Sequence, residues 1–416
     1  MTRVLLVSQY YWPESFTITA EVARLTRAGL HVTVLTGQPN YPAGKIFPGY
    51  RALSIRRENV QGIEVIRLPL FPRGAGSGLR LLLNYASFIL SGLLIAPFLL
   101  RKRRFDVVFV FGLSPLLQAL PAILLSRLKH APMVIWVQDL WPESLSATGF
   151  IRNPALLGLV RSLVRLIYRN SARILVQSEA FRAPVAALSP PGAAIHCVPN
   201  SGQFVPEGCI PSDAARALGE RIAQGFTIVF AGNLGHAQGL DTVLDALDHL
   251  RDLPDLRLCL VGSGALDGWL AEERHRRGLT MLDLPGRFAP EDMPAILSQA
   301  SALLVSLRKE EIFSLTVPSK MQTYLSAGRP ILAALDGEGA RILNEAGAGL
   351  ASPAGDAEAL ATTIRRMASL PEAERRAMGL SGRRCFDTHF APDRITALLS
   401  GHLTAAARSG ARHQGD

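Results

Sequence analysis

The sequence contains few of the residues that mark a secreted or metal-binding protein. Its 416 residues include only four cysteines, which are scattered without the close pairs of a zinc site and suit a reducing compartment. No Asp-x-Asp string occurs, so the chain has no obvious pair of carboxylates for a divalent cation. The first eight residues predict a strand, since a signal peptide needs a longer apolar run and a cleavage site. We therefore expect a cytoplasmic protein without a metal site.

Acidic residues are scarce in the first half of the chain. Residues 1–200 contain 22 Arg and Lys against 8 Asp and Glu, a balance of +14, whereas residues 201–416 contain 22 against 26, a balance of −4. This asymmetry predicts two domains with different partners. A basic domain suits nucleic acid or an anionic membrane surface. Because no aromatic-rich basic stripe or nucleic-acid motif is present, we expect a membrane surface and no nucleic acid.

Short β-rich apolar runs alternate with helix-length segments along the whole chain. In the first half these runs are Val4–Val7, Val32–Thr36, Val65–Leu68, Val107–Phe111, Val134–Val137 and Ile174–Gln177. In the second half they are Thr227–Ala231, Arg257–Val261, Ala302–Ser306 and Pro330–Ala334. Such runs predict parallel sheets with helices on both faces. Two series of them predict an α/β protein with two doubly wound, Rossmann-like domains.

A stretch rich in proline and glycine, Pro199 to Pro211, predicts the boundary between these domains. We expect the first domain to cover residues 1–202 and the second to cover residues 203–384. A terminal helix over residues 385–404 is expected to return to the first domain. The small, polar tail over residues 405–416 is expected to be disordered.

The segment Leu81–Leu100 contains about 20 uncharged residues, which is long enough to span a bilayer, and the basic run Arg101–Arg104 follows it. The strands predicted before and after it belong to one sheet, and a single crossing would separate them. A buried helix or helical hairpin is therefore favoured, followed by an interfacial membrane-binding element and, last, a true span.

A second basic segment has helical spacing. Arg161, Arg165 and Arg169 are four residues apart, so they share one face of a predicted helix. This face is either a solvated stripe on an ordinary amphipathic helix or a surface for lipid headgroups.

Glycine-rich turns follow several predicted strands of the second half. The segment Phe230–Leu240 contains Gly232, Gly235 and Gly239 between a strand and a helix. Glycines there let the backbone approach a diphosphate, and a helix N-terminus favours its charge. Further turns contain Gly262 and Gly286. Glycines at several carboxyl ends of one sheet predict a phosphate-binding site more strongly than one turn does.

Lys320 stands in the more specific segment Pro318–Pro330 and is one of only five lysines in the chain. At the start of a helix it could hold a positive charge against a phosphate. The alternative is an ordinary surface lysine at a helix start.

Four stretches together resemble the family-four glycosyltransferases of the GT-B fold, and within them the bacterial fucosamine-transferase subgroup of O-antigen and capsule synthesis. The stretches are Tyr10–Glu14, Gly37–Gly44, Trp136–Ser144 and the glycine turns with Pro318–Pro330. They extend over most of the chain in the family's order. The strings Gln-Pro-Asn-Tyr-Pro at 38–42 and Asp-Leu-Trp-Pro-Glu-Ser at 139–144 are specific to this resemblance.

The resemblance implies two Rossmann-like domains facing across a cleft, with the acceptor bound by the first and a nucleotide-diphosphate sugar by the second. It implies catalytic roles for Asp139, Glu143 and Glu311. It implies acceptor or cleft positions at Trp12, Glu14, Asn40 and Tyr41. The implied donor-binding residues are Gly232, Asn233, Gly235, Gln238, Gly239, Gly262, Arg287, Phe288, Arg308, Glu310, Ser319, Lys320 and Thr323.

The chain departs from the family pattern at three positions. Many relatives have Arg and Lys where Asn233 and Gln238 stand, and His where Gln138 stands. Phosphate binding then depends on backbone amides, Lys320 and Arg308, and the sugar contact shifts to Asp139 with Glu143 nearby.

The reaction implied by the resemblance is a retaining transfer from a UDP-sugar, whose sugar is an N-acetylated amino sugar, to a lipid-linked acceptor of the undecaprenyl type. The nucleotide sugar is a substrate, so no cofactor is expected. A metal-independent reaction must stabilise the leaving group with amides, a helix dipole and cationic side chains. The enzyme would associate peripherally with the inner face of the cell membrane. Two alternatives remain, a nucleotide-sugar epimerase of the same fold and a non-enzymatic two-lobed sugar-binding protein.

Overall fold

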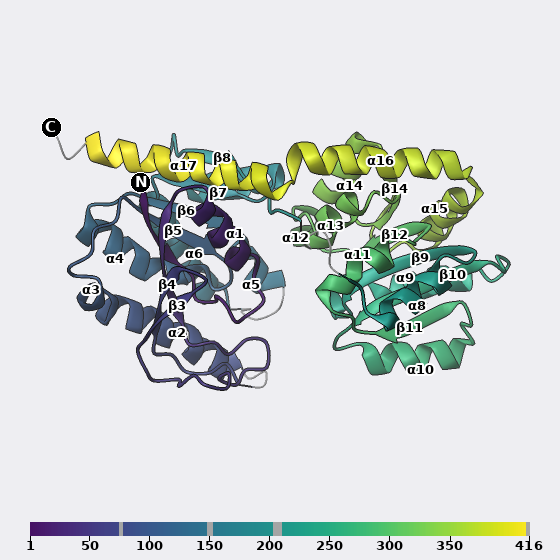
Figure 1. Ribbon diagram of the computed structural model, residues 1–416, viewed down its shortest axis with the longest axis horizontal. Coiled ribbons are helices and arrows are strands. Elements are labelled where there is room, and N and C mark those ends of the chain that lie inside the picture. The colour runs from purple at the N-terminus through teal and green to yellow at the C-terminus, as the bar shows by residue number, and fades with distance from the viewer. Residues whose placement is uncertain (75–77, 148–152, 203–209, 413–416) are drawn as a thin grey trace. The chain divides into compact units, whose positions relative to one another are not determined.

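The computed structural model describes residues 1–74, 78–147, 153–202 and 210–412 (Figure 1). The chain divides into two compact units. The first unit comprises Met1–Pro199 together with the segment from Asp393 onward, and the second comprises Asn200–Pro392. Both ends of the chain therefore belong to the first unit.

An eight-stranded sheet forms the centre of the first unit. Its strands are β1 (Arg3–Val7), β2 (His31–Gly37), β3 (Arg56–Val60), β4 (Ile63–Leu68), β5 (Val107–Gly112), β6 (Met133–Val137), β7 (Arg173–Val176) and β8 (Ile195–Cys197). They lie in the order β3-β4-β2-β1-β5-β6-β7-β8, and only the β3–β4 pair is antiparallel. The strand order reverses between β1 and β5, as in a doubly wound fold.

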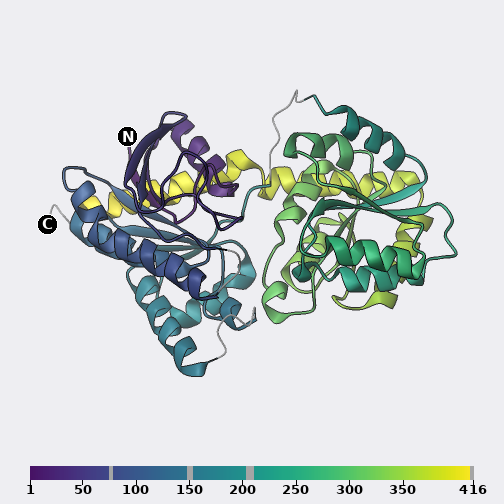
Figure 2. The same ribbon diagram turned by 90° about the horizontal axis from the view of Figure 1, so that it is seen from below.

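Helices cover both faces of this sheet (Figure 2). They are α1 (Thr17–Arg27), α2 (Gly78–Leu94), α3 (Ala96–Leu99), α4 (Ala119–Lys129), α5 (Glu143–Ala147), α6 (Pro154–Arg169), α7 (Arg182–Leu188) and α17 (Pro392–Arg412). Helices α1 and α17 share one buried cluster with alternate side chains of β1 and β5. Helices α2, α4 and α6 pack beside one another and lie over the opposite face.

A six-stranded parallel sheet forms the centre of the second unit. Its strands are β9 (Phe226–Asn233), β10 (Leu256–Ser263), β11 (Leu282–Gly286), β12 (Ala302–Ser306), β13 (Ile331–Ala334) and β14 (Gly349–Ser352). They lie in the order β11-β10-β9-β12-β13-β14. The order reverses between β9 and β12, which is the dinucleotide-binding arrangement of a Rossmann fold.

Two buried clusters fill the two faces of this second sheet. One contains side chains from α8 (Asp213–Ile222), α11 (Met293–Leu297), α13 (Ser319–Ala327), α14 (Glu338–Ala346) and α16 (Glu372–His389). The other contains side chains from α9 (Leu240–Asp248), α10 (Asp267–Arg277) and α15 (Ala357–Ser369). The remaining helices are α12 (Glu311–Ser314) and the short 3-10 turns Leu116–Gln118, Glu179–Phe181, His236–Gln238 and Pro290–Asp292. The predicted α/β fold with two Rossmann-like domains of the GT-B type is confirmed.

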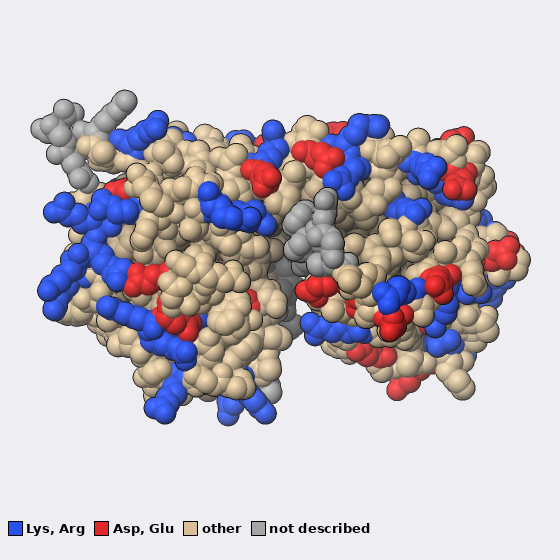
Figure 3. Space-filling model, in the orientation of Figure 1, with Lys and Arg blue, Asp and Glu red and all other residues tan. Residues whose placement is uncertain are grey.

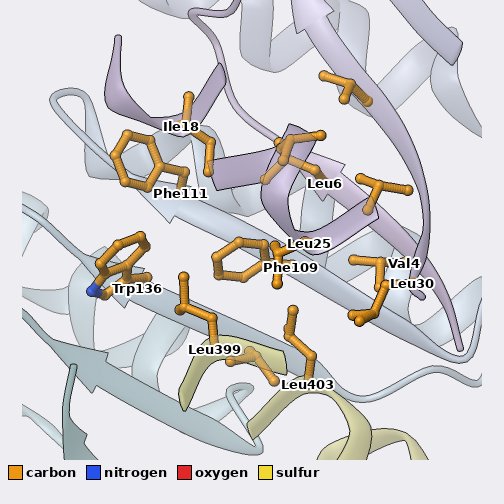
Figure 4. Packing of buried hydrophobic residues seen from close by; sticks show 14 of the residues in the cluster. Val4, Leu6, Ile18, Leu25, Leu30, Phe109, Phe111, Trp136, Leu399 and Leu403 are labelled. Atoms are coloured by element: carbon orange, nitrogen blue, oxygen red, sulfur yellow. The ribbon is translucent and has the colours of Figure 1, made fainter. Parts of the chain in front are cut away.

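Helix α17 attaches the end of the chain to the first unit. Leu399 and Leu403 lie against Phe109 and Trp136 of the sheet, as Figure 4 shows. The Thr396 hydroxyl also donates to Glu21 Oε2 of α1 at 3.3 Å. The expected return of the terminal helix to the first domain is therefore present, although this helix begins at Pro392, and residue 385 belongs to α16.

The expectation of a disordered tail from residue 405 was wrong for the part that the structure describes. Helix α17 continues to Arg412, and Ala406 is buried against the first core. The alanines at 405–407 favour a helix, and the packing of Ala406 adds a tertiary contact that a polar tail would lack. Residues 413–416 lie outside the described residues.

Strands β3, β8 and β14 were not predicted, and β11 was expected only from the glycine turn at its end. Strand β3 has the sequence Arg-Arg-Glu-Asn-Val and lies at the edge of its sheet, where a polar strand needs no apolar run. Strands β8 and β14 are short edge strands of three and four residues. All three are therefore held by their neighbours rather than by a hydrophobic pattern of their own.

The apolar segment Leu81–Leu100 forms α2 and α3 with one buried and one exposed face. Asn84, Phe88 and Gly92 are buried on one side of α2, so the prediction of a packed helix holds for that side. The other side exposes apolar side chains, namely Leu79, Leu82, Leu83, Leu90 and Leu94, with Phe98 following in α3. None of the helices in the described part of the chain has the length and hydropathy needed to cross a bilayer.

Candidate functional site

The strands of the second sheet separate where their order reverses. Strand β12 pairs with β9 only through Ala302↔Ile228 and Leu303↔Val229, so the two strands are unpaired toward their carboxyl ends. In doubly wound folds this gap at the switch point is where ligands bind. The predicted glycine turn Gly232–Gly239 begins at this end of β9.

The hydroxyl of Tyr324, on α13, forms hydrogen bonds with backbone groups of β9 that β12 leaves unpaired. The Ala231 N–H donates to the Tyr324 hydroxyl at 2.6 Å, and this hydroxyl lies 3.3 Å from the Ala231 carbonyl oxygen. Tyr324 is buried, so α13 is held firmly against the end of β9. The first turn of α13, which contains Ser319 and Lys320, is thereby positioned beside the glycine turn.

Lys320 lies in the second unit with its ammonium group largely removed from water. Its Nζ lies 3.6 Å from the centroid of the Phe230 ring and donates to Gln238 Oε1. Burial lowers the pKa of Lys320 to about 7. No carboxylate lies within 4 Å of this ammonium in the described ranges, so its charge is available to an anion. Gln238 and Lys320, both predicted as donor-binding residues, are thus in direct contact.

Close backbone approach explains two of the predicted glycines. A Cβ atom at Gly262 of β10 would lie 1.8 Å from the Gly232 carbonyl oxygen. Gly239 has a φ of +59°, and a Cβ there would lie 3.2 Å from the Arg308 nitrogen. Any larger residue would separate β9 from β10 or displace the turn from the β12 loop.

The other predicted donor-binding residues of the second unit lie next to this turn or farther along the same edge of the sheet. The Arg308 N–H donates to Ala237 O at 3.0 Å, which joins the loop after β12 to the turn. The side chains of Asn233, Arg308, Glu310, Glu311 and Ser319 are exposed. Gly235 is buried beside Asn233, and Thr323 lies one turn into α13. Arg287 is exposed after β11, two strands from β9, and Phe288 packs against the core.

The loops at the carboxyl edge of the first sheet are joined by hydrogen bonds. The Gln9 N–H after β1 donates to Gln118 Oε1 at 2.6 Å. The Ser114 N–H after β5 donates to Asp139 Oδ2 after β6 at 2.8 Å. This is again the edge at which the strand order reverses, here between β1 and β5. Burial raises the pKa of the Asp139 carboxyl, and the bond from Ser114 opposes that shift.

Two of the predicted cleft residues are buried inside these loops. Glu14 accepts backbone N–H groups from Asn40 at 2.8 Å, Tyr41 at 2.7 Å and Tyr11 at 3.3 Å. Burial raises the pKa of Glu14 to about 7 in spite of these bonds. Asn40 is fully buried, and its Oδ1 accepts from the Arg73 N–H at 3.0 Å. Both side chains therefore hold the loop that presents Tyr41, and neither faces a ligand directly.

The remaining predicted residues of the first unit are more accessible. Trp12 and Tyr41 are partly exposed, and Glu143 is exposed at the start of α5. Each lies at a carboxyl-edge loop or the helix that follows it.

Arg73, Tyr10 and Tyr85 lie at this edge and were not among the predicted site residues. The guanidinium of Arg73 lies 5.0 Å from the Tyr41 ring centroid and 5.9 Å from that of Tyr10. Its Nη1 donates to the Tyr10 hydroxyl at 3.2 Å. Burial raises the pKa of Tyr85 on α2, the Arg73 charge and the Tyr10 hydroxyl lower it, and the Asp139 charge raises it. Arg73 lies five residues after the end of a predicted strand. A position close to the carboxyl end of a strand was the signal by which the sequence could have pointed to it.

Comparisons with known proteins match both units. The model of the "Glycosyl transferase 4-like domain" matches residues 17–201, and that of "Glycosyl transferases group 1" matches residues 225–369. The chain is 28% identical over 338 residues to WcaI of Escherichia coli K12, which is named for a glycosyl transferase role in colanic acid biosynthesis. That alignment covers 78% of this chain and 81% of the relative. WbjE of Pseudomonas aeruginosa, named as a glycosyltransferase, is 27% identical over 65% of this chain and 68% of its own length.

Solved structures share the fold at lower identity. Sucrose-phosphate synthase from Thermosynechococcus elongatus superimposes with a TM-score of 0.71 at 18% identity, covering 98% of this chain and 100% of that one. HepE from Anabaena in complex with UDP-glucose gives a TM-score of 0.66 at 18% identity, covering 97% and 100%.

Proposed function

The chain belongs to the family-four glycosyltransferases, and from this membership we propose that it transfers a sugar from a UDP-sugar to a lipid-linked acceptor in bacterial surface polysaccharide synthesis. The transferred group is proposed to be an N-acetylated amino sugar, with retention of configuration. The names of WcaI and WbjE support a glycosyltransferase, and that of WcaI supports a polysaccharide pathway. The family favours transfer over the epimerase and sugar-binding alternatives.

The observation that carries the proposal is Lys320 at the gap between β9 and β12. A largely desolvated ammonium group without a carboxylate partner is costly unless a negative ligand compensates its desolvation. The glycine turn brings backbone groups and the start of α13 to the same place, and both suit a diphosphate. The Anabaena neighbour was solved with UDP-glucose, which supports UDP as the nucleotide.

The proposed reaction is a front-face displacement at the anomeric carbon. The acceptor hydroxyl forms the new glycosidic bond as the bond to the UDP oxygen breaks, and its proton passes to the departing phosphate. Lys320, Arg308 and the turn amides stabilise the negative charge that develops on UDP. Asp139 orients the sugar, and Glu311 and Glu310 contact its hydroxyls.

The leaving group is proposed to need no divalent cation. No group of three or more His, Cys, Asp or Glu side chains with metal-binding geometry occurs in the residues that the structure describes. The cationic side chains at the turn supply the charge that a metal would otherwise bring.

The first unit is proposed to bind an anionic membrane surface peripherally. The exposed leucines of α2 lie on a helix layer with α4 and α6, which expose Leu128, Leu156, Leu159 and Leu166. Arg161, Arg165 and Arg169 are all exposed on α6. Basic side chains are also prominent at the α3–α4 end of the first unit (Figure 3), where a recess of about 410 Å³ is lined by Arg101, Arg103, Arg104 and Lys129.

An anionic bilayer fits this layer better than another protein surface does, because apolar and basic side chains alternate along it. Apolar side chains can enter the interface while the arginines contact lipid phosphates. A lipid-linked acceptor would be reached from the same surface.

The direct test is a thermal-shift screen of the purified chain against UDP- and GDP-sugars, followed by a transfer assay with lipid-linked acceptors. A ligand that binds only the folded state raises the unfolding midpoint. We expect a UDP-sugar to raise it and to be consumed only when acceptor is present. Stabilisation by GDP-sugars alone would disprove the proposed donor, and consumption of donor without acceptor would favour the epimerase.

A further inference from the structure

We propose that Arg73 is the acceptor phosphate anchor, binding the diphosphate of a prenyl-linked acceptor beside Tyr10 and Tyr41. This inference rests on the proposed function and extends it to a specific residue and ligand group. No feature of the predicted motifs includes Arg73.

The backbone at Arg73 is held in place from two sides. Its own N–H donates to Asn40 Oδ1 at 3.0 Å, and the N–H of Gly74 donates to the Gly44 carbonyl oxygen at 2.9 Å. Gly44 and Gly74 approach so closely that a Cβ at Gly44 would lie 2.0 Å from the Gly74 oxygen. The two loops therefore present Arg73 in one position, which reduces the entropy that a ligand must overcome.

The guanidinium of Arg73 has aromatic neighbours and no acidic partner. It lies over the rings of Tyr10 and Tyr41, and its Nη1 donates to the Tyr10 hydroxyl. No carboxylate oxygen lies within 4 Å of it among the described residues. Arg67 shows the contrast, because it is fully buried and paired with Glu58. Arg73 is only partly buried, so its remaining N–H donors can bind an external anion.

Arg73 and Asp139 lie on loops at the same edge of the first sheet. Both charges act on Tyr85 of α2, whose pKa is raised by burial and by the Asp139 charge while Arg73 lowers it. One cation, three tyrosines and one carboxylate thus occupy the same edge of the first sheet.

Apolar surface adjoins Arg73 on the side of α2. Phe71 is 52% exposed, and its N–H and carbonyl bond to Ser87 and Asn84 of α2. The exposed leucines of α2 begin at Leu79. A cation next to exposed apolar side chains matches a ligand with a phosphate head and a hydrocarbon tail. A free sugar or a nucleotide has no hydrocarbon tail, so it would leave the apolar part of this surface uncovered.

The test measures binding of geranyl diphosphate by calorimetry with UDP at saturation, so that the Lys320 site is already filled. Wild type, Arg73→Gln, Arg73→Lys and the control Arg27→Gln are compared. Arg27 is exposed in the last turn of α1, so its substitution removes the same charge from the same unit. We expect Arg73→Gln to weaken binding at least tenfold, Arg73→Lys to weaken it less, and Arg27→Gln to leave it unchanged.

Binding of geraniol and of inorganic diphosphate is measured in the same way, because the first has only the hydrocarbon tail of the ligand and the second only its phosphates. Weaker binding of each than of geranyl diphosphate supports an amphiphilic ligand. Equal affinity of wild type and Arg73→Gln for geranyl diphosphate, or equal losses in Arg73→Gln and Arg27→Gln, would overturn the assignment. Failure of the proposed function looks different, because wild type would then show no UDP-sugar-dependent transfer while Arg73-dependent binding persisted. Unfolding midpoints confirm that each variant is folded.

Discussion

At the scale of single residues, the proposed donor site predicts that the Lys320 ammonium contributes to UDP binding. We expect Lys320→Ala to weaken UDP binding by about 1.5–3 kcal/mol, the loss of a charge-assisted phosphate contact, or roughly 10- to 100-fold. Lys309→Ala is the matched control, because Lys309 is exposed nearby in the same unit. Calorimetry with UDP measures both. Unchanged affinity in Lys320→Ala would remove Lys320 from the donor site.

The lowered pKa of Lys320 also predicts a pH dependence. With a folded-state pKa of about 7, the amine is largely neutral at pH 8–9 and must take up a proton to pair with a diphosphate. UDP affinity should therefore fall as pH rises above 7, by up to about tenfold per unit. Proton uptake is measured by calorimetry in buffers of different ionisation enthalpy. An affinity that is flat from pH 6.5 to 9 in wild type, or falls equally in Lys320→Ala, would contradict this mechanism.

Asp139 is expected to act on turnover rather than on nucleotide binding. It belongs to the first unit and accepts from Ser114 N–H, whereas the proposed donor site belongs to the second. Asp139→Asn should lower kcat by roughly 100-fold or more and leave the Kd for UDP unchanged. Asp106→Asn, a surface aspartate of the first unit paired with Arg3, is the control. A parallel loss of UDP binding would make Asp139 a structural residue.

At the scale of elements, the attachment of α17 should weaken in acid. His402 Nδ1 lies 3.2 Å from Arg173 Nη1, and the His402 and His196 ring centroids lie 4.6 Å apart with the rings tilted by 40°. Burial, His196 and Arg173 lower the pKa of His402 from 6.5 to about 4. The unfolded chain therefore binds a proton more readily, so the stability from neutral His402 is complete above pH 6.5 and is lost toward pH 4.

The test compares unfolding midpoints of wild type, His402→Gln and His31→Gln between pH 7 and 4. His31 is an exposed histidine of the same unit. The difference between wild type and His402→Gln should shrink or reverse as the pH falls, while His31→Gln follows wild type. A constant difference across this range would show that folding does not shift the pKa of His402.

At the scale of the whole molecule, the exposed apolar and basic layer predicts peripheral membrane binding. Flotation with liposomes containing anionic lipid should carry the wild type upward at low salt. Arg101, Lys102 and Arg104 replaced by Ser should weaken binding by roughly 1 kcal/mol per residue and reduce its salt dependence. Arg103 is left in place because it pairs with Glu64. Leu90→Ser with Leu94→Ser should weaken binding even at high salt.

A matched pair on the other unit controls for general charge. Arg274→Ser and Arg384→Ser, both exposed in the second unit, should leave flotation unchanged. Wild-type protein that remains at the bottom of the gradient at low salt would show that the exposed leucines of α2 do not bind a membrane.

The chemistry of the whole enzyme should also survive chelation. Transfer is expected to continue in EDTA, because cationic side chains and amides stabilise the leaving group. Activity that is lost with EDTA and restored by magnesium or manganese would overturn the metal-free mechanism.

The amino-acid sequence alone predicts the fold class and most central strands of both sheets, because buried parallel strands need apolar runs. It also located the glycine turn and Lys320, since close backbone approach and a lone lysine are local signals. It did not predict the edge strands β3, β8 and β14, whose residues are polar or short, or the helix over residues 405–412, which depends on packing of Ala406 on a distant core.

Which side chains meet depends on how distant segments of the chain pack together. Tyr324 fills the gap between β9 and β12 although it lies 93 residues from Ala231, and Phe230 and Gln238 enclose Lys320. Glu14 and Asn40 match the family strings, yet both are buried as supports of the loops that carry Tyr41 and Arg73. Arg73 belongs to no motif and is brought to Tyr10 over 63 residues. Sequence motifs reflect the local conformation that the backbone requires. The environment of a charged side chain depends instead on contacts between segments that are far apart in the sequence.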